Sequence, residues 1–131
     1  MNLGRRERVL VIEDEASVRE NLVRFLELEG YLVSATGDGT SGVAMALRSP
    51  PDLVLCDLNL PGLDGFGILA LLRADPRTAG LPFVFLTASA EIEDAKTGYR
   101  LGADEYVTKP FSMPVLAAII RQRLDSAGKA A

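Results

Sequence analysis

The side chains best suited to chemistry in this chain each follow a short apolar run. They are two acids after the first run, one acid after the third, a hydroxyl after the fourth and an amine after the fifth: Glu13, Asp14, Asp57, Thr87 and Lys109. Ligands of open α/β sheets bind beyond the carboxyl ends of the strands, so these groups are expected at one edge of a sheet. Together they would suit a divalent cation and a phosphoryl group.

The three carboxylates predict a cation between them. Glu13, Asp14 and Asp57 would repel one another and raise one another's pKa values unless a positive ion lay among them. Mg2+ prefers hard oxygen ligands and keeps several waters, which leaves room for a phosphate oxygen, and Mn2+ is the alternative ion. We expect Asp14 and Asp57 to ligate directly and Glu13 to ligate through water. The backbone carbonyl of Asn59 is expected to add a further oxygen.

A carboxylate such as Asp57 can attack phosphorus and form an aspartyl-phosphate. Transfer of this kind depends on positioning and charge neutralisation more than on acid–base chemistry. We expect the cation to contact one phosphoryl oxygen, Lys109 a second and Thr87 a third. The chain contains no histidine, which excludes a histidine base, a histidine metal ligand and an internal phosphohistidine.

Short apolar runs alternate with helical patterns along the chain, as in βα units. Strands are expected at 8–13, 31–36, 52–57, 82–87 and 104–108, and helices at 16–29, 38–48, 64–74, 91–101 and 113–125. Right-handed crossovers then predict a single-domain (βα)5 fold of the flavodoxin-like, three-layer α/β type. Its parallel five-stranded sheet would have the order 2-1-3-4-5, with the switch point between the first and third strands.

Local signals predict where several helices begin and end. A capping box of Ser17 and Glu20 would start the first helix and Gly30 would end it, while Ser112 is the expected N-cap of the last helix. Gly98 weakens the fourth helix by roughly 1 kcal/mol relative to alanine. This glycine either makes the helix malleable, as would suit a signalling element, or merely permits close packing.

The composition is that of one globular domain of 131 residues, with 48% apolar residues and a net charge of −4. We expect a domain over 1–126 and a short polar tail, or the start of a linker, over 127–131. The single cysteine, Cys56, excludes an internal disulfide and fits a reducing cytoplasm. The charge pattern and the short apolar runs predict no direct nucleic-acid binding and no membrane span.

Four segments, in order and at characteristic intervals, carry a resemblance to a known family. They are residues 11–15, 57–65, 86–88 and 102–111. The chain resembles a response-regulator receiver domain of two-component signalling over about residues 7–125. Two positions depart from the common pattern: Glu13 stands where Asp is also common, and Leu60 stands where the family often has Met.

The resemblance implies that Asp57 accepts a phosphoryl group from a histidine kinase or a phosphotransfer protein in a Mg2+-dependent reaction. It implies a signalling switch that catalyses only its own phosphorylation and dephosphorylation. In this family the switch maps to Thr87 and Tyr106, and it acts on the face formed by the fourth helix, fifth strand and fifth helix. The peptide bond between residues 109 and 110 is often cis in such proteins.

The last helix carries two adjacent apolar stripes. The first should face the core: Leu116, Ile120 and Leu124. The second consists of Val115 and Ile119, positions at which many DNA-binding regulators with symmetric receiver dimers carry charges. Their apolar character argues against that salt-bridged dimer. Either they form, with Tyr106, a docking patch for a partner or for a second copy in a homodimer, or the helix simply has a wider buried face.

Other functions fit these residues less well. A haloacid-dehalogenase-type phosphatase carries a second Asp two residues after its nucleophile, where this chain has Asn59. A flavodoxin-like FMN binder needs a hydroxyl- and glycine-rich loop after the first strand, where the acids at 13–15 would repel phosphate. A receiver that serves only as a scaffold would lack part of the acceptor set, which is complete here. The chain is either a stand-alone regulator or the receiver of a larger protein.

Overall fold

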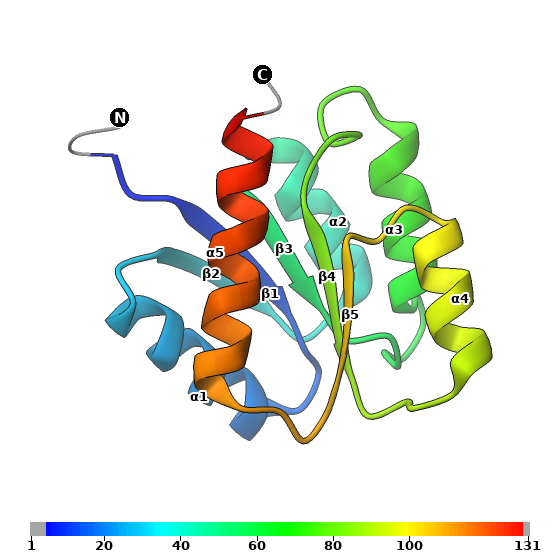
Figure 1. Cartoon of the computed structure of the whole chain (residues 1–131). Coiled ribbons are helices and arrows are strands. Elements are labelled where there is room, and N and C mark those ends of the chain that lie inside the picture. Colours follow the sequence, from blue (N-terminus) through cyan, green and yellow to red (C-terminus); the bar gives the residue numbers. More distant parts are fainter. Residues whose placement is uncertain (1–4, 130–131) are drawn as a thin grey trace.

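The computed structural model describes residues 5–129, in which strands and helices alternate along the chain (Figure 1). The strands are β1 (Arg8–Ile12), β2 (Leu32–Thr36), β3 (Leu53–Cys56), β4 (Phe83–Thr87) and β5 (Glu105–Thr108). The helices are α1 (Ala16–Leu28), α2 (Gly39–Arg48), α3 (Gly65–Ala74), α4 (Ile92–Arg100) and α5 (Met113–Lys129). Each expected element is present, with ends that differ from the expectation by a few residues.

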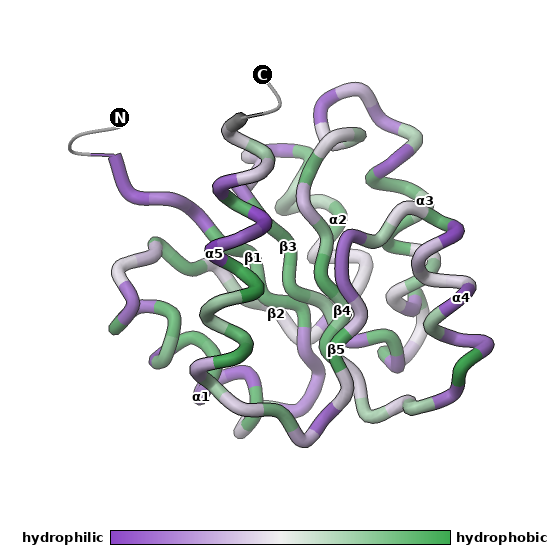
Figure 2. The backbone as a smooth tube through the Cα atoms, viewed as in Figure 1, coloured by the Kyte–Doolittle hydropathy of each residue, from purple (hydrophilic) through white to green (hydrophobic). Residues whose placement is uncertain are grey.

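The strands form one parallel sheet in the order β2-β1-β3-β4-β5, which confirms the expected topology. The three inner strands β1, β3 and β4 are buried along nearly all of their length. Strands covered on both faces read as continuous apolar runs rather than alternating ones, which explains their composition. Figure 2 shows these strands as hydrophobic segments at the centre of the molecule.

The helices cover the two faces of the sheet and create two separate cores (Figure 1). On one face α1 and α5 pack against inward residues of β1, β3 and β4, and the predicted core stripe of α5 lies here fully buried or nearly so. On the other face α2, α3 and α4 pack against the alternate residues of the same strands. A three-layer sandwich results, and its strand ends meet at one edge.

Two of the expected helix ends are confirmed, and a third is wrong. Gly30 ends α1 with a φ of +100°, a backbone conformation that favours glycine. The Ser112 hydroxyl accepts a hydrogen bond from the Val115 N–H over 3.4 Å at the start of α5. The Ser17–Glu20 capping box is not formed, because α1 begins at Ala16 and Ser17 already lies inside it.

Helix α5 continues to Lys129, four residues beyond the expected end at 125. An ion pair between Arg121 and Asp125 lies in the turn before this extension, and residues 126–131 contain no proline that would stop the helix. The expected tail at 127–131 is therefore helical as far as 129, and residues 130–131, like residues 1–4, lie outside the described range. No helix within residues 5–129 combines the length and apolar character needed to cross a membrane.

Candidate functional site

The parallel register of β1 and β3 brings the predicted acids together. Ile12 and Cys56 are partners across these strands, so the next residues, Glu13 and Asp57, leave the sheet side by side. The Asp57 N–H donates to the Ile12 carbonyl over 3.0 Å, which extends the ladder one residue past the strand. The carboxylates thus project from rigid backbone at the switch point, where the topology places ligands.

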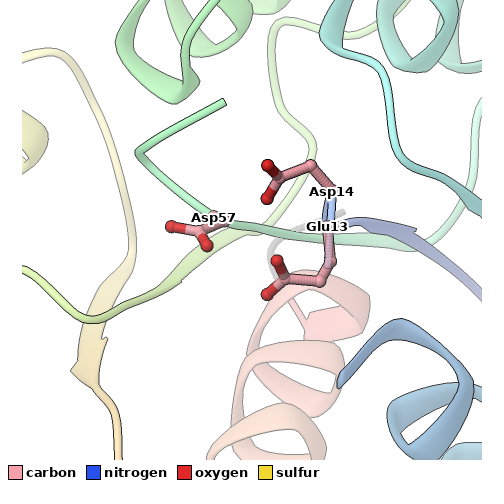
Figure 3. Close-up of side chains that lie close together, drawn as sticks. All are labelled: Glu13, Asp14 and Asp57. Atoms are coloured by element: carbon pink, nitrogen blue, oxygen red, sulfur yellow. The ribbon is translucent and has the colours of Figure 1, made fainter. Parts of the chain in front are cut away.

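The carboxylates of Glu13, Asp14 and Asp57 form one cluster at the ends of β1 and β3 (Figure 3). Each residue offers an oxygen atom, and these atoms lie within 4.8 Å of one another. Glu13 and Asp57 are only 2% and 8% exposed, while Asp14 lies on the surface. Oxygen ligands on fixed strand ends, open to solvent at one side, suit the partly hydrated coordination of Mg2+. The donor set therefore fits the expected cation.

Lys109 bridges two of the acids across the site. Its Nζ lies 2.5 Å from Glu13 Oε1 and 3.1 Å from Asp57 Oδ2. Burial lowers the pKa of Lys109, but its hydrogen bonds to the two carboxylates outweigh burial and raise that pKa above its ordinary value. Burial has the opposite effect on an acid: it raises the pKa of Glu13, and the hydrogen bond from Lys109 opposes this rise. The ammonium group thus already neutralises part of the negative charge, and its contact with Glu13 was not predicted. The Lys109–Pro110 peptide bond is cis.

The two oxygens of Asp57 have different partners, which fixes the orientation of the carboxylate. Oδ1 accepts the Asn59 N–H over 3.1 Å, and Oδ2 faces Lys109. Gly65, near the start of the helix expected at 64–74, packs against the backbone of Asp57. A Cβ atom at Gly65 would lie 2.6 Å from the Asp57 carbonyl oxygen. The absence of a side chain there lets α3 begin directly beside the site.

Thr87 and Tyr106, the predicted switch residues, meet at Ser89. The Thr87 hydroxyl is fully buried and accepts the Ser89 N–H over 3.2 Å. The Tyr106 hydroxyl donates to the Ser89 carbonyl over 3.0 Å. The backbone of one residue thus joins the two, a link that the sequence did not indicate because serine two residues after a strand is a common loop residue.

The ring of Tyr106 is half-buried and packs against Phe85, with 5.7 Å between the ring centroids. A Cβ atom at Gly98 would lie 3.1 Å from the ring of Phe85 and 3.5 Å from that of Tyr106. Of the two interpretations of Gly98, close packing therefore has direct support. The glycine lets α4 approach the aromatic residues of β4 and β5.

The three residues of the predicted docking patch have different environments. Val115 is 55% exposed on α5, and Ile119 and Tyr106 are half-buried. Because Val115 is exposed, the alternative that α5 simply buries a wider face does not hold at this residue. The patch thus lies at the surface, on α5 and on the edge strand β5.

Comparison with known proteins agrees with this site and fold. Residues 9–121 match the profile of the family described as response regulator receiver domain. The chain is 41% identical to the DNA-binding dual master transcriptional regulator RpaA of Synechocystis sp., over 89% of this chain and 48% of that protein. The chain spans about half the length of the curated relatives that it matches.

Two solved structures have a backbone fold similar to that of this chain. A CheY-like response regulator receiver domain protein from Methanospirillum hungatei has a TM-score of 0.90 at 26% identity, over 97% of this chain and 100% of that one. The receiver domain of sensor histidine kinase PA1611 from Pseudomonas aeruginosa has a TM-score of 0.86 at 29% identity, over 92% and 99%. That structure has a magnesium ion coordinated in its active-site cleft.

The fold, the acidic cluster and the profile match lead to one assignment: this chain belongs to the response regulator receiver domain family. It is a signalling module of two-component systems rather than an enzyme.

Proposed function

We propose that this chain is a phosphoryl-accepting receiver of a two-component phosphorelay, and that Asp57 takes the phosphoryl group from a histidine kinase or a phosphotransfer protein. The observation that carries the proposal is the buried carboxylate of Asp57, held between Lys109 Nζ and the Asn59 N–H inside the acidic cluster. Both oxygens of this carboxylate are oriented by hydrogen-bond donors, and its charge is balanced by a neighbouring ammonium group, as suits a carboxylate nucleophile.

In the proposed step an oxygen of Asp57 attacks phosphorus, the P–N bond of a donor phosphohistidine breaks, and the imidazole nitrogen keeps the electron pair and takes up a proton. Glu13 and Asp14 would hold Mg2+ together with Asp57 and the carbonyl of Asn59, and the bound ion supplies charge neutralisation at one phosphoryl oxygen. Lys109 lies within hydrogen-bonding reach of the acceptor and would supply positive charge to a second oxygen.

The proposed switch passes from Thr87 to Tyr106. The hydroxyl of Thr87 accepts a hydrogen bond from Ser89, so it is free to turn its own proton toward a third phosphoryl oxygen. Such a movement alters the loop whose carbonyl holds the Tyr106 hydroxyl. The phosphate stabilises the conformation in which it makes the better contacts. The population of that conformation then rises, and the α4-β5-α5 face changes with it.

The proposal is tested by intact mass spectrometry after incubation with Mg2+ and acetyl phosphate. We expect a gain of one phosphoryl group, which EDTA prevents and which hydroxylamine removes because an acyl phosphate is labile to this nucleophile. If the mass stays unchanged with both acetyl phosphate and a set of phosphorylated kinases or phosphotransfer proteins, the chain is not a phosphoryl acceptor.

The partners follow from the same proposal. We propose a histidine kinase or phosphotransfer protein as donor, with the reaction in the cytoplasm, which is consistent with Cys56 being a free thiol. The relatives named as DNA-binding regulators are about twice as long as this chain, and so we propose that nucleic-acid contacts of any full-length protein lie outside this domain.

We also propose that the patch of Tyr106, Val115 and Ile119 binds a second copy of this chain through apolar contacts. The charged residue of α5 one turn after Ile119 is engaged within the chain, since Arg123 pairs with Glu105 of β5. This internal pair leaves the exposed side chain of Val115 and the half-buried side chain of Ile119 as apolar groups that α5 can offer to a second copy.

An Ile119→Glu substitution tests the patch. We expect self-association, measured by sedimentation velocity with and without phosphorylation, to weaken by about tenfold, because a carboxylate would have to be desolvated at the contact. Ala44→Glu, on an exposed position of α2 over the opposite face of the sheet, adds the same charge away from the patch as a control. Equal association of both variants and the unmodified chain would contradict the proposal, as would a monomer under all conditions.

A further inference from the structure

Arg19 of α1 reaches back to the loop that carries the two adjacent acids. Its Nη1 donates to the Glu13 carbonyl over 2.9 Å and lies 3.4 Å from the Asp14 carbonyl. One guanidinium group therefore binds the backbone of both residues whose carboxylates enter the acidic cluster. The N-cap of α1, Glu15, forms no side-chain cap hydrogen bond within the described residues, so a cap does not hold this loop.

Gly37, in the loop after β2, provides the space for this contact. A Cβ atom there would lie 2.8 Å from Arg19 Nη1 and 3.5 Å from both the Asp14 Cα and the Glu13 carbonyl oxygen. The φ of Gly37 is outside the left-handed region, so the backbone itself does not require glycine. The close approach is instead that of the guanidinium group, whose Nη1 would have to move if position 37 carried a side chain.

The opposite side of the loop is tied to the sheet. The Glu13 N–H donates to the Thr36 carbonyl over 3.0 Å, and Glu13 Oε2 accepts the Glu15 N–H over 3.2 Å. With the N–H side of Glu13 bound to β2 and its carbonyl bound to Arg19, the peptide planes on both sides of this residue are fixed. The direction in which the carboxylates of Glu13 and Asp14 leave the backbone is fixed with them.

We propose that Arg19 is a positioning residue of the metal site and that Gly37 is the position that admits it. This inference rests on the proposed Mg2+ site. Mg2+ requires nearly octahedral geometry and loses affinity when its ligands are displaced, whereas Ca2+ accepts irregular coordination. By holding the carbonyls of Glu13 and Asp14, Arg19 sets the ligand geometry that distinguishes the two ions.

The charge of Arg19 and its positioning contact have opposite effects on metal affinity, so the direction of the change in affinity distinguishes the two roles. A positive group beside the acids repels a cation, so removal of the charge alone would tighten metal binding. Removal of the positioning contact weakens it, and loss of a residue that orients metal ligands typically costs between tenfold and a hundredfold in affinity.

The experiment compares Mg2+ and Ca2+ dissociation constants by isothermal titration calorimetry for the unmodified chain, Arg19→Met, Gly37→Ala and the control Arg24→Met. Arg24 is exposed on the same helix, so its replacement removes the same charge without touching the loop. We expect Arg19→Met to weaken Mg2+ binding about tenfold and Ca2+ binding less. Gly37→Ala should act in the same direction, because its methyl group displaces the guanidinium, and Arg24→Met should stay within about twofold.

Melting temperatures measured without metal show whether each variant is folded, and Gly37→Ala keeps the arginine itself in place. If the unmodified chain binds Mg2+ and Arg19→Met binds it equally well or more tightly, the inference is overturned while the proposed function stands. An equal loss for Mg2+ and Ca2+ also overturns it, since the role would then be structural. If the unmodified chain binds no Mg2+, both the inference and the metal-dependent function are overturned.

Discussion

Replacement of Asp57 by asparagine is expected to abolish the uptake of a phosphoryl group completely. Asparagine has nearly the same shape, and its side-chain oxygen can still accept the Asn59 N–H that now binds Asp57 Oδ1. The amide of asparagine is not a nucleophile toward phosphorus, however, and the substitution also removes one of the three carboxylates around the metal position. The measurement is intact mass with Mg2+ and acetyl phosphate, the condition in which the unmodified chain should gain one phosphoryl group.

Asp64→Asn is the matched control for this prediction. Asp64 lies in the same loop, and its side chain caps α3 by accepting the Gly67 N–H over 2.9 Å. Asparagine caps helices as well as aspartate does, so this variant loses the same charge without loss of fold. We expect it to be phosphorylated normally. A phosphoryl group on Asp57→Asn would show that a different residue is the acceptor, and loss in both variants would assign the effect to charge rather than to the nucleophile.

Lys109→Met is expected to slow phosphorylation by about 10²–10³-fold, because the transferring group loses a fixed positive charge in a partly buried site. The same substitution should tighten Mg2+ binding. Lys109 now holds the Glu13 and Asp57 carboxylates, so the cation competes with the ammonium group for both. Without Lys109, its hydrogen bond no longer opposes the rise in the pKa of Glu13 that burial causes, and bound Mg2+ would supply the positive charge that the ammonium group now provides.

The two effects of Lys109→Met are measured separately, as the rate of mass gain and as the Mg2+ dissociation constant at neutral pH. Lys96→Met, on the exposed surface of α4, removes an equal charge from a loose ion pair with Glu93 and should change neither quantity. A parallel fall in rate and in Mg2+ affinity would mean that Lys109 helps to build the metal site instead of competing with it. An unchanged rate would remove Lys109 from the proposed reaction.

The topology and the location of the site could be predicted because they depend on local signals. Apolar runs of strand length, separated by helical patterns, leave few arrangements once the handedness of βαβ units is imposed. The residues that follow those runs must then meet at one edge. Asp57, Glu13 and Asp14 were found in this way, and so was the end of α1 at Gly30, since a glycine after a helical pattern acts through its own backbone.

Local signals predicted helix boundaries less well where the sequence allowed two different boundaries. The Ser17–Glu20 pair has the pattern of a capping box, yet α1 starts before it, directly after the acidic loop. At the other end of the molecule the small residues after Asp125 suggested a tail, while α5 continues to Lys129. Both differences concern one turn of helix, where packing against the rest of the fold decides the boundary.

The sequence by itself therefore determined the order of the elements, the edge at which the reactive groups gather and the chemistry that those groups allow. Only the tertiary structure decided which side chains touch. Lys109 contacts Glu13 across 96 residues of chain, and Arg19 meets the space left by Gly37. The physical reason is that periodicity and turn signals act over a few residues. A contact between distant side chains depends on how every intervening element packs, because interiors are close-packed and transmit small changes from one element to the next.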